Sequence, residues 1–219
     1  MSATVLSTKK LSPGQKQLLI NAGIGLIEKN FIEIVPLDFV IRQVPKNVIF
    51  SSKNAVKEVL KKNNSRLVKE KNIFCVGQKT ATLLEENGFK VTETADYGTD
   101  LASIIIEKYA SEEFLFYCGK KRSPGLPEKL QKHSVSLLEV EVYDTKLAPK
   151  KYDRSFEGVL FFSPTAVKSF CLENELFEST AFCIGNTTAS EAKKHTERVV
   201  IANKPSIENV IVQAVKKLK

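Results

Sequence analysis

The stretch Val48-Ile-Phe-Ser-Ser-Lys-Asn-Ala-Val-Lys57 occurs a second time in this chain, 111 residues later, as Val159-Leu-Phe-Phe-Ser-Pro-Thr-Ala-Val-Lys168. A second phrase follows each copy, because Cys75-Val-Gly-Gln-Lys-Thr-Ala81 returns 108 residues later as Cys183-Ile-Gly-Asn-Thr-Thr-Ala189. Two phrases in the same order and at nearly the same offset indicate an internal repeat. Since the offset is much longer than one solenoid unit, the repeat predicts two similar small domains.

Each repeated phrase has the pattern of a buried strand, a turn of small or hydroxyl residues, and the start of a helix. The rest of the chain alternates in the same way, with helix starts predicted at Ser12, Thr99 and Ser206. The helix after Ser12 would carry Leu18, Leu19, Ala22 and Leu26 on its apolar side. The alternation predicts an α/β fold with two similar Rossmann-like or flavodoxin-like domains and mainly parallel sheets.

The distribution of strands predicts that one domain is discontinuous. The segment after Phe156 holds too few strands for a full sheet, while residues 1–30 hold a strand and a helix without a sheet of their own. We therefore expect residues 1–30 and 152–219 to form the first domain and residues 42–139 the second. Residues 31–41 and 140–151 would be two linker strands.

Composition places the chain among ordinary globular proteins, with 219 residues, 42% hydrophobic and 26% charged. No long uncharged apolar run predicts a membrane span, and the first ten residues lack the pattern of a signal peptide. We therefore expect a cytoplasmic protein that does not bind membranes. The four cysteines form no CxxC pair, and buried free thiols are favoured over disulfides or a metal site.

The net charge of +8 has two interpretations, a nucleic-acid surface or attraction of a small acidic ligand. The lysines are scattered and no basic motif contains interleaved aromatics, so nucleic-acid binding ranks low and we expect no nucleic-acid partner. The chain has no GxxxxGK[ST], GxGxxG or GxSxG motif. An enzyme of this sequence would need little acid–base or nucleophilic machinery.

The turns after the repeated strands carry hydroxyls at the starts of helices. Free N–H groups of a first helical turn favour anions, and open α/β sheets bind ligands beyond the carboxyl ends of their strands. The candidate ligands for carboxylate or phosphate oxygens are Ser52, Thr80, Ser163, Thr187 and Thr188. The alternative, about equally favoured, is that each hydroxyl only caps its own helix.

The sequence resembles the uroporphyrinogen-III synthase family over nearly its whole length. The resemblance rests on short pieces that occur in the family's order and spacing: Phe50–Val56, Val76–Ala81, Tyr97–Leu101, Cys118–Arg122, Val140–Thr145, Phe161–Val167 and Ile184–Ala189. It implies two α/β domains joined by a two-stranded linker. It also implies cyclisation of hydroxymethylbilane to uroporphyrinogen III, with inversion of ring D and loss of water, without a metal or organic cofactor.

The resemblance further implies residue roles. Tyr143 matches the tyrosine that lies near the leaving hydroxyl, with packing in the linker as the alternative. The five hydroxyl residues match positions that hold substrate carboxylates, largely through backbone amides, and Lys53 and Arg122 are weaker candidates for the same contacts. Where the first strand often ends in Thr-Arg, this chain has Thr8-Lys9, which loses the planar guanidinium.

One other function stays open from the residues alone. A two-domain regulatory protein that closes on an anionic ligand would share the strand–turn–helix pattern but would not need Tyr143. Turnover of the substrate would distinguish it from the enzyme. No feature predicts an oligomer, and we expect a monomer.

Overall fold

The computed structural model describes residues 3–40, 43–62 and 65–219. The chain divides into two units, Met1–Glu33 with Lys146–Lys219 (unit 1) and Ile34–Thr145 (unit 2). Both boundaries fall within strands, so the chain passes from one unit to the other in extended conformation. The boundary that the sequence predicts between residues 41 and 42 lies outside the described residues.

Unit 2 is built on a six-stranded sheet with the order β3-β8-β7-β4-β5-β6. Its elements in chain order are β3 (Ile32–Pro36), β4 (Asn47–Phe50), α2 (Lys53–Lys61), α3 (Ser65–Val68), β5 (Asn72–Val76), α4 (Gln78–Glu86), β6 (Val91–Ala95), α5 (Gly98–Tyr109), β7 (Glu113–Gly119), α6 (Gly125–Lys132) and β8 (Ser136–Leu147). Neighbouring strands from β8 to β6 all pair in parallel. Their carboxyl ends therefore lie at one edge of the sheet.

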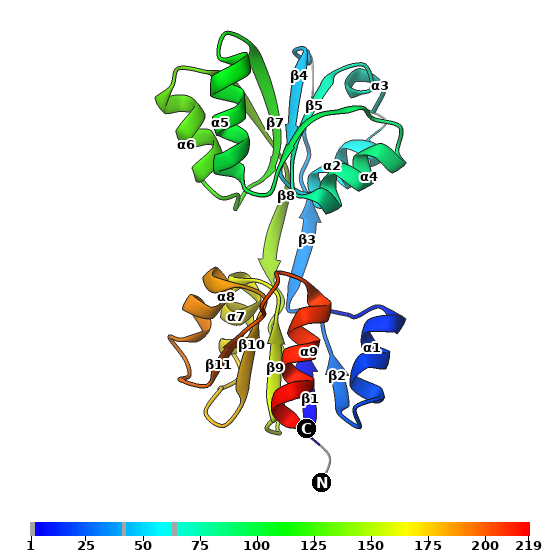
Figure 1. The fold of residues 1–219 in the computed structure, drawn as a ribbon, viewed down its shortest axis with the longest axis vertical. Coiled ribbons are helices and arrows are strands. Elements are labelled where there is room, and N and C mark those ends of the chain that lie inside the picture. Colours follow the sequence, from blue (N-terminus) through cyan, green and yellow to red (C-terminus); the bar gives the residue numbers. More distant parts are fainter. Residues whose placement is uncertain (1–2, 41–42, 63–64) are drawn as a thin grey trace. The chain divides into compact units, whose positions relative to one another are not determined.

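Helices cover both faces of this sheet, with α5 and α6 on one side and α2 and α4 on the other (Figure 1). Successive residues of β4 point to opposite faces of the sheet. Val48 and Phe50 pack in the hydrophobic cluster under α2 and α4, whereas Ile49 packs in the cluster under α5 and α6. Strands buried on both faces are continuous apolar runs. This is why residues 48–50 and 114–118 are continuous runs of buried hydrophobic residues.

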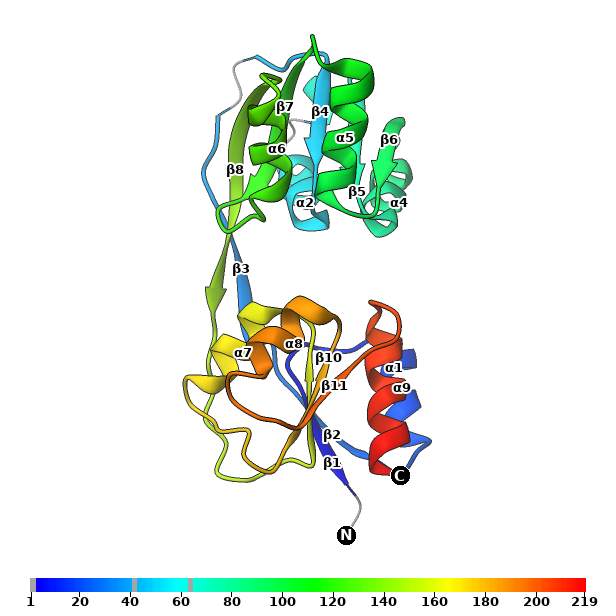
Figure 2. The same cartoon turned by 60° about the vertical axis from the view of Figure 1, so that its left-hand side comes forward.

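Unit 1 is built on a five-stranded sheet with the order β11-β10-β9-β1-β2, in which every pair is parallel. Its elements are β1 (Thr4–Ser7), α1 (Pro13–Ile20), β2 (Gly25–Glu28), β9 (Gly158–Phe161), α7 (Pro164–Cys171), β10 (Thr180–Cys183), α8 (Asn186–Ala192), β11 (Val199–Ile201) and α9 (Ile207–Leu218). β1 lies beside β9, so this sheet combines segments from both ends of the chain. Figure 2 shows α7 and α8 on one face and α1 and α9 on the other.

The repeated phrases form the same structures in the two units. The first forms β4 with α2 and β9 with α7, and in both copies a serine caps the helix. Ser52 and Ser163 each accept a hydrogen bond from a backbone N–H of the first turn at 3.1 Å. The second phrase forms β5 with α4 and β10 with α8, which follow Gly77 and Gly185. The predicted α/β fold with two parallel sheets is therefore confirmed.

Two local predictions are wrong. The helix after Ser12 ends at Ile20, because Gly23 adopts a φ of 73° and the following Gly25–Glu28 pairs with β1 as a strand. Leu26 therefore lies in β2 and not on the helix. The helix predicted to follow a Thr99 cap begins two residues earlier, at Gly98, and its N-cap is Tyr97, whose side chain makes no capping hydrogen bond.

Among the described residues, no helix has the length and apolar character that crossing a membrane requires. The four cysteines are free thiols, of which Cys75, Cys118 and Cys183 are buried and Cys171 is half-buried.

Burial makes the four thiols weak acids, which predicts both their reactivity and a pH dependence of stability. It raises the pKa of Cys75 and shifts that of Cys118 to about 12, Cys171 to about 11 and Cys183 to about 12. In the unfolded chain the thiols ionise near pH 9, so the free energy of unfolding should fall as pH rises from about 9 towards 12. At pH 8 a disulfide reagent should titrate the three buried thiols only after unfolding.

A spectrophotometric titration with and without guanidinium tests this expectation, and urea unfolding at pH 8 and pH 10 tests the stability. A rapid reaction of more than one thiol in the folded protein would contradict it.

Candidate functional site

The site lies where the strand order of unit 2 reverses. The chain proceeds from β4 to β5 and β6 in one direction and then returns to β7 and β8 on the other side of β4. In open parallel sheets, ligands bind at such a switch point, outside the carboxyl ends of the strands. A pocket of about 500 Å³ opens there between the turns that follow β4, β6 and β7. Its lining residues are Ser51, Ser52, Val76, Tyr97, Gly98, Thr99, Phe116, Lys121, Arg122, Ser123, Gly125, Leu126 and Tyr143.

Three helices begin at this pocket. α2 starts after Ser52, and α5 and α6 start within the segments that contribute Gly98 and Gly125. A Cβ at Gly98 would lie 3.2 Å from Cβ of Leu126, and one at Gly125 would lie 3.1 Å from Cγ2 of Thr99. The two glycines thus let the first turns of α5 and α6 pack closely. Since first-turn N–H groups lack intrahelical acceptors, the pocket favours an anion.

Two cations border the same pocket. Arg122 forms a two-pronged ion pair with Glu139, in which Nε donates to Oε2 and Nη2 donates to Oε1 at 2.7 Å. This pairing raises the pKa of Arg122. Lys121 Nζ donates to the carbonyl of Thr145 at 2.8 Å and lies 4.0 Å from the carboxylate of Asp144. Both cations are partly exposed, so they contribute positive charge to the pocket while their own carboxylates hold them.

Tyr143 reaches the pocket from β8. Its carbonyl accepts a hydrogen bond from the N–H of Lys120 at 2.9 Å, and its ring packs against the cluster under α2 and α4. Within the described ranges, no hydrogen bond occupies its hydroxyl. The hydroxyl is therefore available to a bound molecule.

The structure brings together three of the residues singled out from the sequence, because Ser52, Arg122 and Tyr143 all line this pocket. Lys53 is the exposed first residue of α2 and lies outside the lining. Thr80 lies in the first turn of α4, is only 5% exposed and is not among the residues that line the pocket.

The other three predicted residues belong to unit 1. Ser163 caps α7, Thr187 is an exposed residue of α8, and Thr188 is only 1% exposed. The strand order of unit 1 reverses between β9 and β1, so Ser163 lies at a second switch point.

The loop after β1 is the counterpart in unit 1 of the segment that carries Lys121 and Arg122. Thr8 is 2% exposed, and its hydroxyl donates to the carbonyl of Leu160 at 2.7 Å. The next residue, Lys9, is exposed. The threonine thus anchors the loop to β9, and a basic residue follows the strand end as it does after β7.

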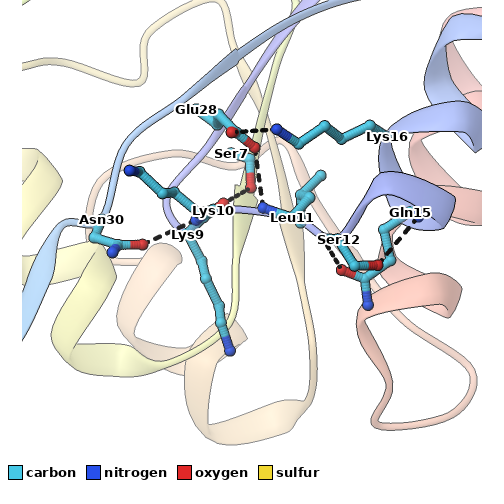
Figure 3. Close-up of polar contacts among 9 residues, drawn as sticks. All are labelled: Ser7, Lys9, Lys10, Leu11, Ser12, Gln15, Lys16, Glu28 and Asn30. Carbon is cyan, nitrogen blue, oxygen red and sulfur yellow. Dashed lines mark hydrogen bonds and ion pairs between the residues drawn. The ribbon is translucent and has the colours of Figure 1, made fainter.

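Figure 3 shows how neighbouring side chains hold this loop. The N–H of Lys10 donates to Oδ1 of Asn30 at 2.9 Å, and the N–H of Leu11 donates to Oε2 of Glu28 at 3.0 Å. Lys16 Nζ donates to the other oxygen of Glu28 at 2.6 Å. The backbone between β1 and α1 is therefore fixed by residues at the end of β2.

Most of the residues that line the pocket were not predicted from the sequence. Besides three apolar lining residues, the residues not assigned to the site were Ser51, Tyr97, Gly98, Thr99, Lys121, Ser123 and Gly125, together with Glu139, which holds Arg122. The first seven follow the ends of β4, β6 and β7, so their position just after a strand is a signal that could have found them. The partner of Arg122 has no such signal, because it lies on a different strand.

Comparison with known proteins shows which family this chain is similar to. The family model of uroporphyrinogen-III synthase HemD matches residues 15–211. The porphyrin biosynthesis protein HemD of Ruminiclostridium josui is 27% identical over 183 residues, which are 75% of this chain and 36% of the relative. The chain thus spans about a third of the length of that curated relative.

Two solved structures share the fold. Uroporphyrinogen-III synthetase from Helicobacter pylori aligns with a TM-score of 0.78 and 20% identity, over 99% of this chain and 100% of that one. A mutant uroporphyrinogen III synthase from Thermus thermophilus aligns with a TM-score of 0.67 and 12% identity, over 99% and 98%.

Proposed function

This chain belongs to the uroporphyrinogen-III synthase HemD family, and on that premise we propose that it converts hydroxymethylbilane to uroporphyrinogen III. Ring D is inverted and water is lost as the macrocycle closes, which makes the enzyme a cyclising hydro-lyase. The observation that carries the proposal is the family match over residues 15–211. The pocket of unit 2 supports it because it combines positive charge, helix N-termini and a tyrosine hydroxyl.

The charge of the pocket suits the substrate. Hydroxymethylbilane carries carboxylates on all four rings, and a protein of net charge +8 attracts such a polyanion. The first turns of α2, α5 and α6 offer N–H groups, and Lys121 and Arg122 add cationic donors. Substrate carboxylates would bind to these groups, with the Ser52 hydroxyl beside them.

The chemistry needs positioning and assistance to one leaving group. We assign Tyr143 to the hydroxyl that departs, to which the phenol donates a hydrogen bond or its proton as the C–O bond breaks. Loss of water leaves a cationic azafulvene, which the folded chain of rings attacks to close the macrocycle. Holding the reacting atoms together supplies a large share of the acceleration in such intramolecular steps.

We assign the remaining predicted residues to binding of the substrate carboxylates. Lys53 would contribute its amine at the start of α2. Because the side chains of Thr80 and Thr188 are buried, they would act through the backbone of their helix starts, together with Ser163 and Thr187. Lys9 would take the place of an arginine that is common in the family. The protein is proposed to be a cytoplasmic monomer that needs no cofactor.

An isomer assay tests the activity. Purified protein is supplied with freshly generated hydroxymethylbilane, and the oxidised products are separated into uroporphyrins I and III. We expect the III isomer to dominate. Formation of the I isomer alone, at the spontaneous rate, would contradict the proposal, and binding without turnover would favour a regulatory protein.

Glu139→Gln should strengthen binding of polycarboxylates. The change removes the carboxylate that occupies Nε and Nη2 of Arg122, so a substrate carboxylate no longer competes with it. We expect about three- to tenfold tighter binding of uroporphyrin III, a stable product analogue, in a calorimetric titration. Glu141→Gln removes the same charge from an exposed position on β8 and is the matched control. Equal effects of the two changes would show that net charge alone matters.

A further inference from the structure

We propose that Gly119, at the end of β7, positions Tyr143 for catalysis by leaving room for its ring. The catalytic part of this inference rests on the proposed function, whereas the positioning itself rests on the packing of β7 against β8. Gly119 touches no substrate in this scheme and acts only through Tyr143.

A β-bulge places the tyrosine opposite the glycine. β7 and β8 pair in regular register from Glu113 with Ser136 to Cys118 with Glu141, but Gly119 then pairs with Tyr143. The extra residue of β8 is Val142, which is fully buried. In a regular strand consecutive residues point to opposite faces, yet Val142 and Tyr143 both pack against the cluster under α2 and α4. The bulge has therefore redirected Tyr143, as bulges beside functional sites often do.

The ring of Tyr143 occupies the space that a side chain at position 119 would fill. A Cβ on Gly119 would lie 2.5 Å from Cζ, 2.7 Å from Cε2 and 2.8 Å from the hydroxyl oxygen of Tyr143. All three atoms belong to the tip of the side chain, which carries the chemistry. Any residue with a Cβ at position 119 must therefore displace the end of the tyrosine ring together with its hydroxyl.

The backbone on both sides leaves little freedom to relieve such a contact. The N–H of Lys120 donates to the carbonyl of Tyr143 at 2.9 Å, which ties the two strands together beside the glycine. The N–H of Arg122 donates to the carbonyl of Gly119 at 3.0 Å, which closes the turn into the pocket. An added methyl group should accordingly move the tyrosine ring and not the strands.

The kinetic test is a double-mutant cycle. We expect Gly119→Ala to lower kcat for uroporphyrinogen III formation about tenfold, with a change in KM of less than about threefold. In a Tyr143→Ala background, which has no ring to displace, the same change should lower kcat by less than about twofold. Additive effects in the cycle would overturn the proposal.

Gly158→Ala is the matched control. Gly158 is a strand glycine of unit 1, and its added Cβ would lie 2.6 Å from Cε2 of Phe182, so it creates the same kind of clash in the unit that does not contain Tyr143. It should lower the melting temperature but leave kcat per folded molecule unchanged. A fall in kcat equal to that of Gly119→Ala would mean that lost stability explains both.

Fluorine NMR makes the positioning measurable without turnover. Of the five tyrosines in a protein labelled with 3-fluorotyrosine, the resonance of Tyr143 is the one that Tyr143→Phe removes. Gly119→Ala should shift this resonance while those of Tyr97, Tyr109 and Tyr152 stay in place, which also shows that the variant folds. An unmoved resonance would overturn the inference. If the wild-type chain forms no uroporphyrinogen III, the proposed function fails, and the shift still decides whether Gly119 positions Tyr143.

Discussion

Tyr143→Phe is expected to lower kcat for uroporphyrinogen III formation by about tenfold or more, while KM stays within about twofold. The change removes only the hydroxyl. The ring keeps its contacts with the buried cluster under α2 and α4 and its place over Gly119, so binding of the substrate carboxylates should be preserved. A group that acts on the leaving hydroxyl stabilises the transition state more than the bound substrate, and its loss therefore appears in kcat.

Single-turnover kinetics with isomer analysis would measure this effect. As the enzymatic rate falls, a larger share of the bilane should close spontaneously to the I isomer. Tyr97→Phe is the control, since Tyr97 lines the same pocket but is 67% exposed and is the residue that precedes α5. If Tyr143→Phe keeps the wild-type rate, Tyr143 is only a packing residue. The same conclusion would follow if Tyr97→Phe lowered the rate equally.

Phe50→Ala and Phe161→Ala should each destabilise the unit that contains the substitution by about 3–5 kcal/mol. The two residues occupy the same position of the repeated phrase, at the ends of β4 and β9. Phe50 is 1% exposed and its ring centroid lies 5.3 Å from that of Tyr117, whereas Phe161 is fully buried and lies 5.7 Å from Phe170. Each alanine would leave a cavity beneath a helix that the phenylalanine supports.

Hydrogen exchange followed by mass spectrometry in increasing urea would locate the loss. Peptides from 34–145 should lose protection in Phe50→Ala, and peptides from the two segments of unit 1 in Phe161→Ala. Phe177→Ala provides the control, because Phe177 is 76% exposed and its removal should change stability by less than about 0.5 kcal/mol. Loss of protection in the wrong unit would contradict the assignment of separate cores.

The fold could be predicted because its signals are local. The repeated strand–turn–helix, Ser12 followed by Pro13, and the cap at Ser206 each act within a few residues of the element they start. β2 was missed because Leu18, Ala22 and Leu26 keep helical spacing across a turn that only the positive φ of Gly23 reveals. Its strand conformation is stabilised by pairing with β1, which is a tertiary interaction.

The candidate site was predictable only where a residue's neighbours along the chain determine its environment. The position of Ser52 could be inferred from the end of β4, whereas Tyr143 and Arg122 were indicated by the family resemblance. Thr80 carries the same hydroxyl pattern, but it is only 5% exposed and lies outside the pocket lining, which the pattern alone does not reveal. The pocket itself required knowledge that β7 lies beside β4, since the strand order defines the switch point. The same limit hid Glu139, whose contact with Arg122 joins β8 to the turn after β7.

The insertion of unit 2 between β2 and β9 also sets an order of events during synthesis. Unit 2 leaves the ribosome as one continuous run, whereas β1 must wait for β9, with Val5 paired to Gly158 across 153 residues. The entropy of closing a loop grows with its length. When unit 2 folds, β3 becomes the neighbour of β8, and the loop left for β1 and β9 to close is much shorter. We therefore expect unit 1 to form after unit 2, and Phe50→Ala to slow the refolding of unit 1 although the substituted residue lies in the other unit.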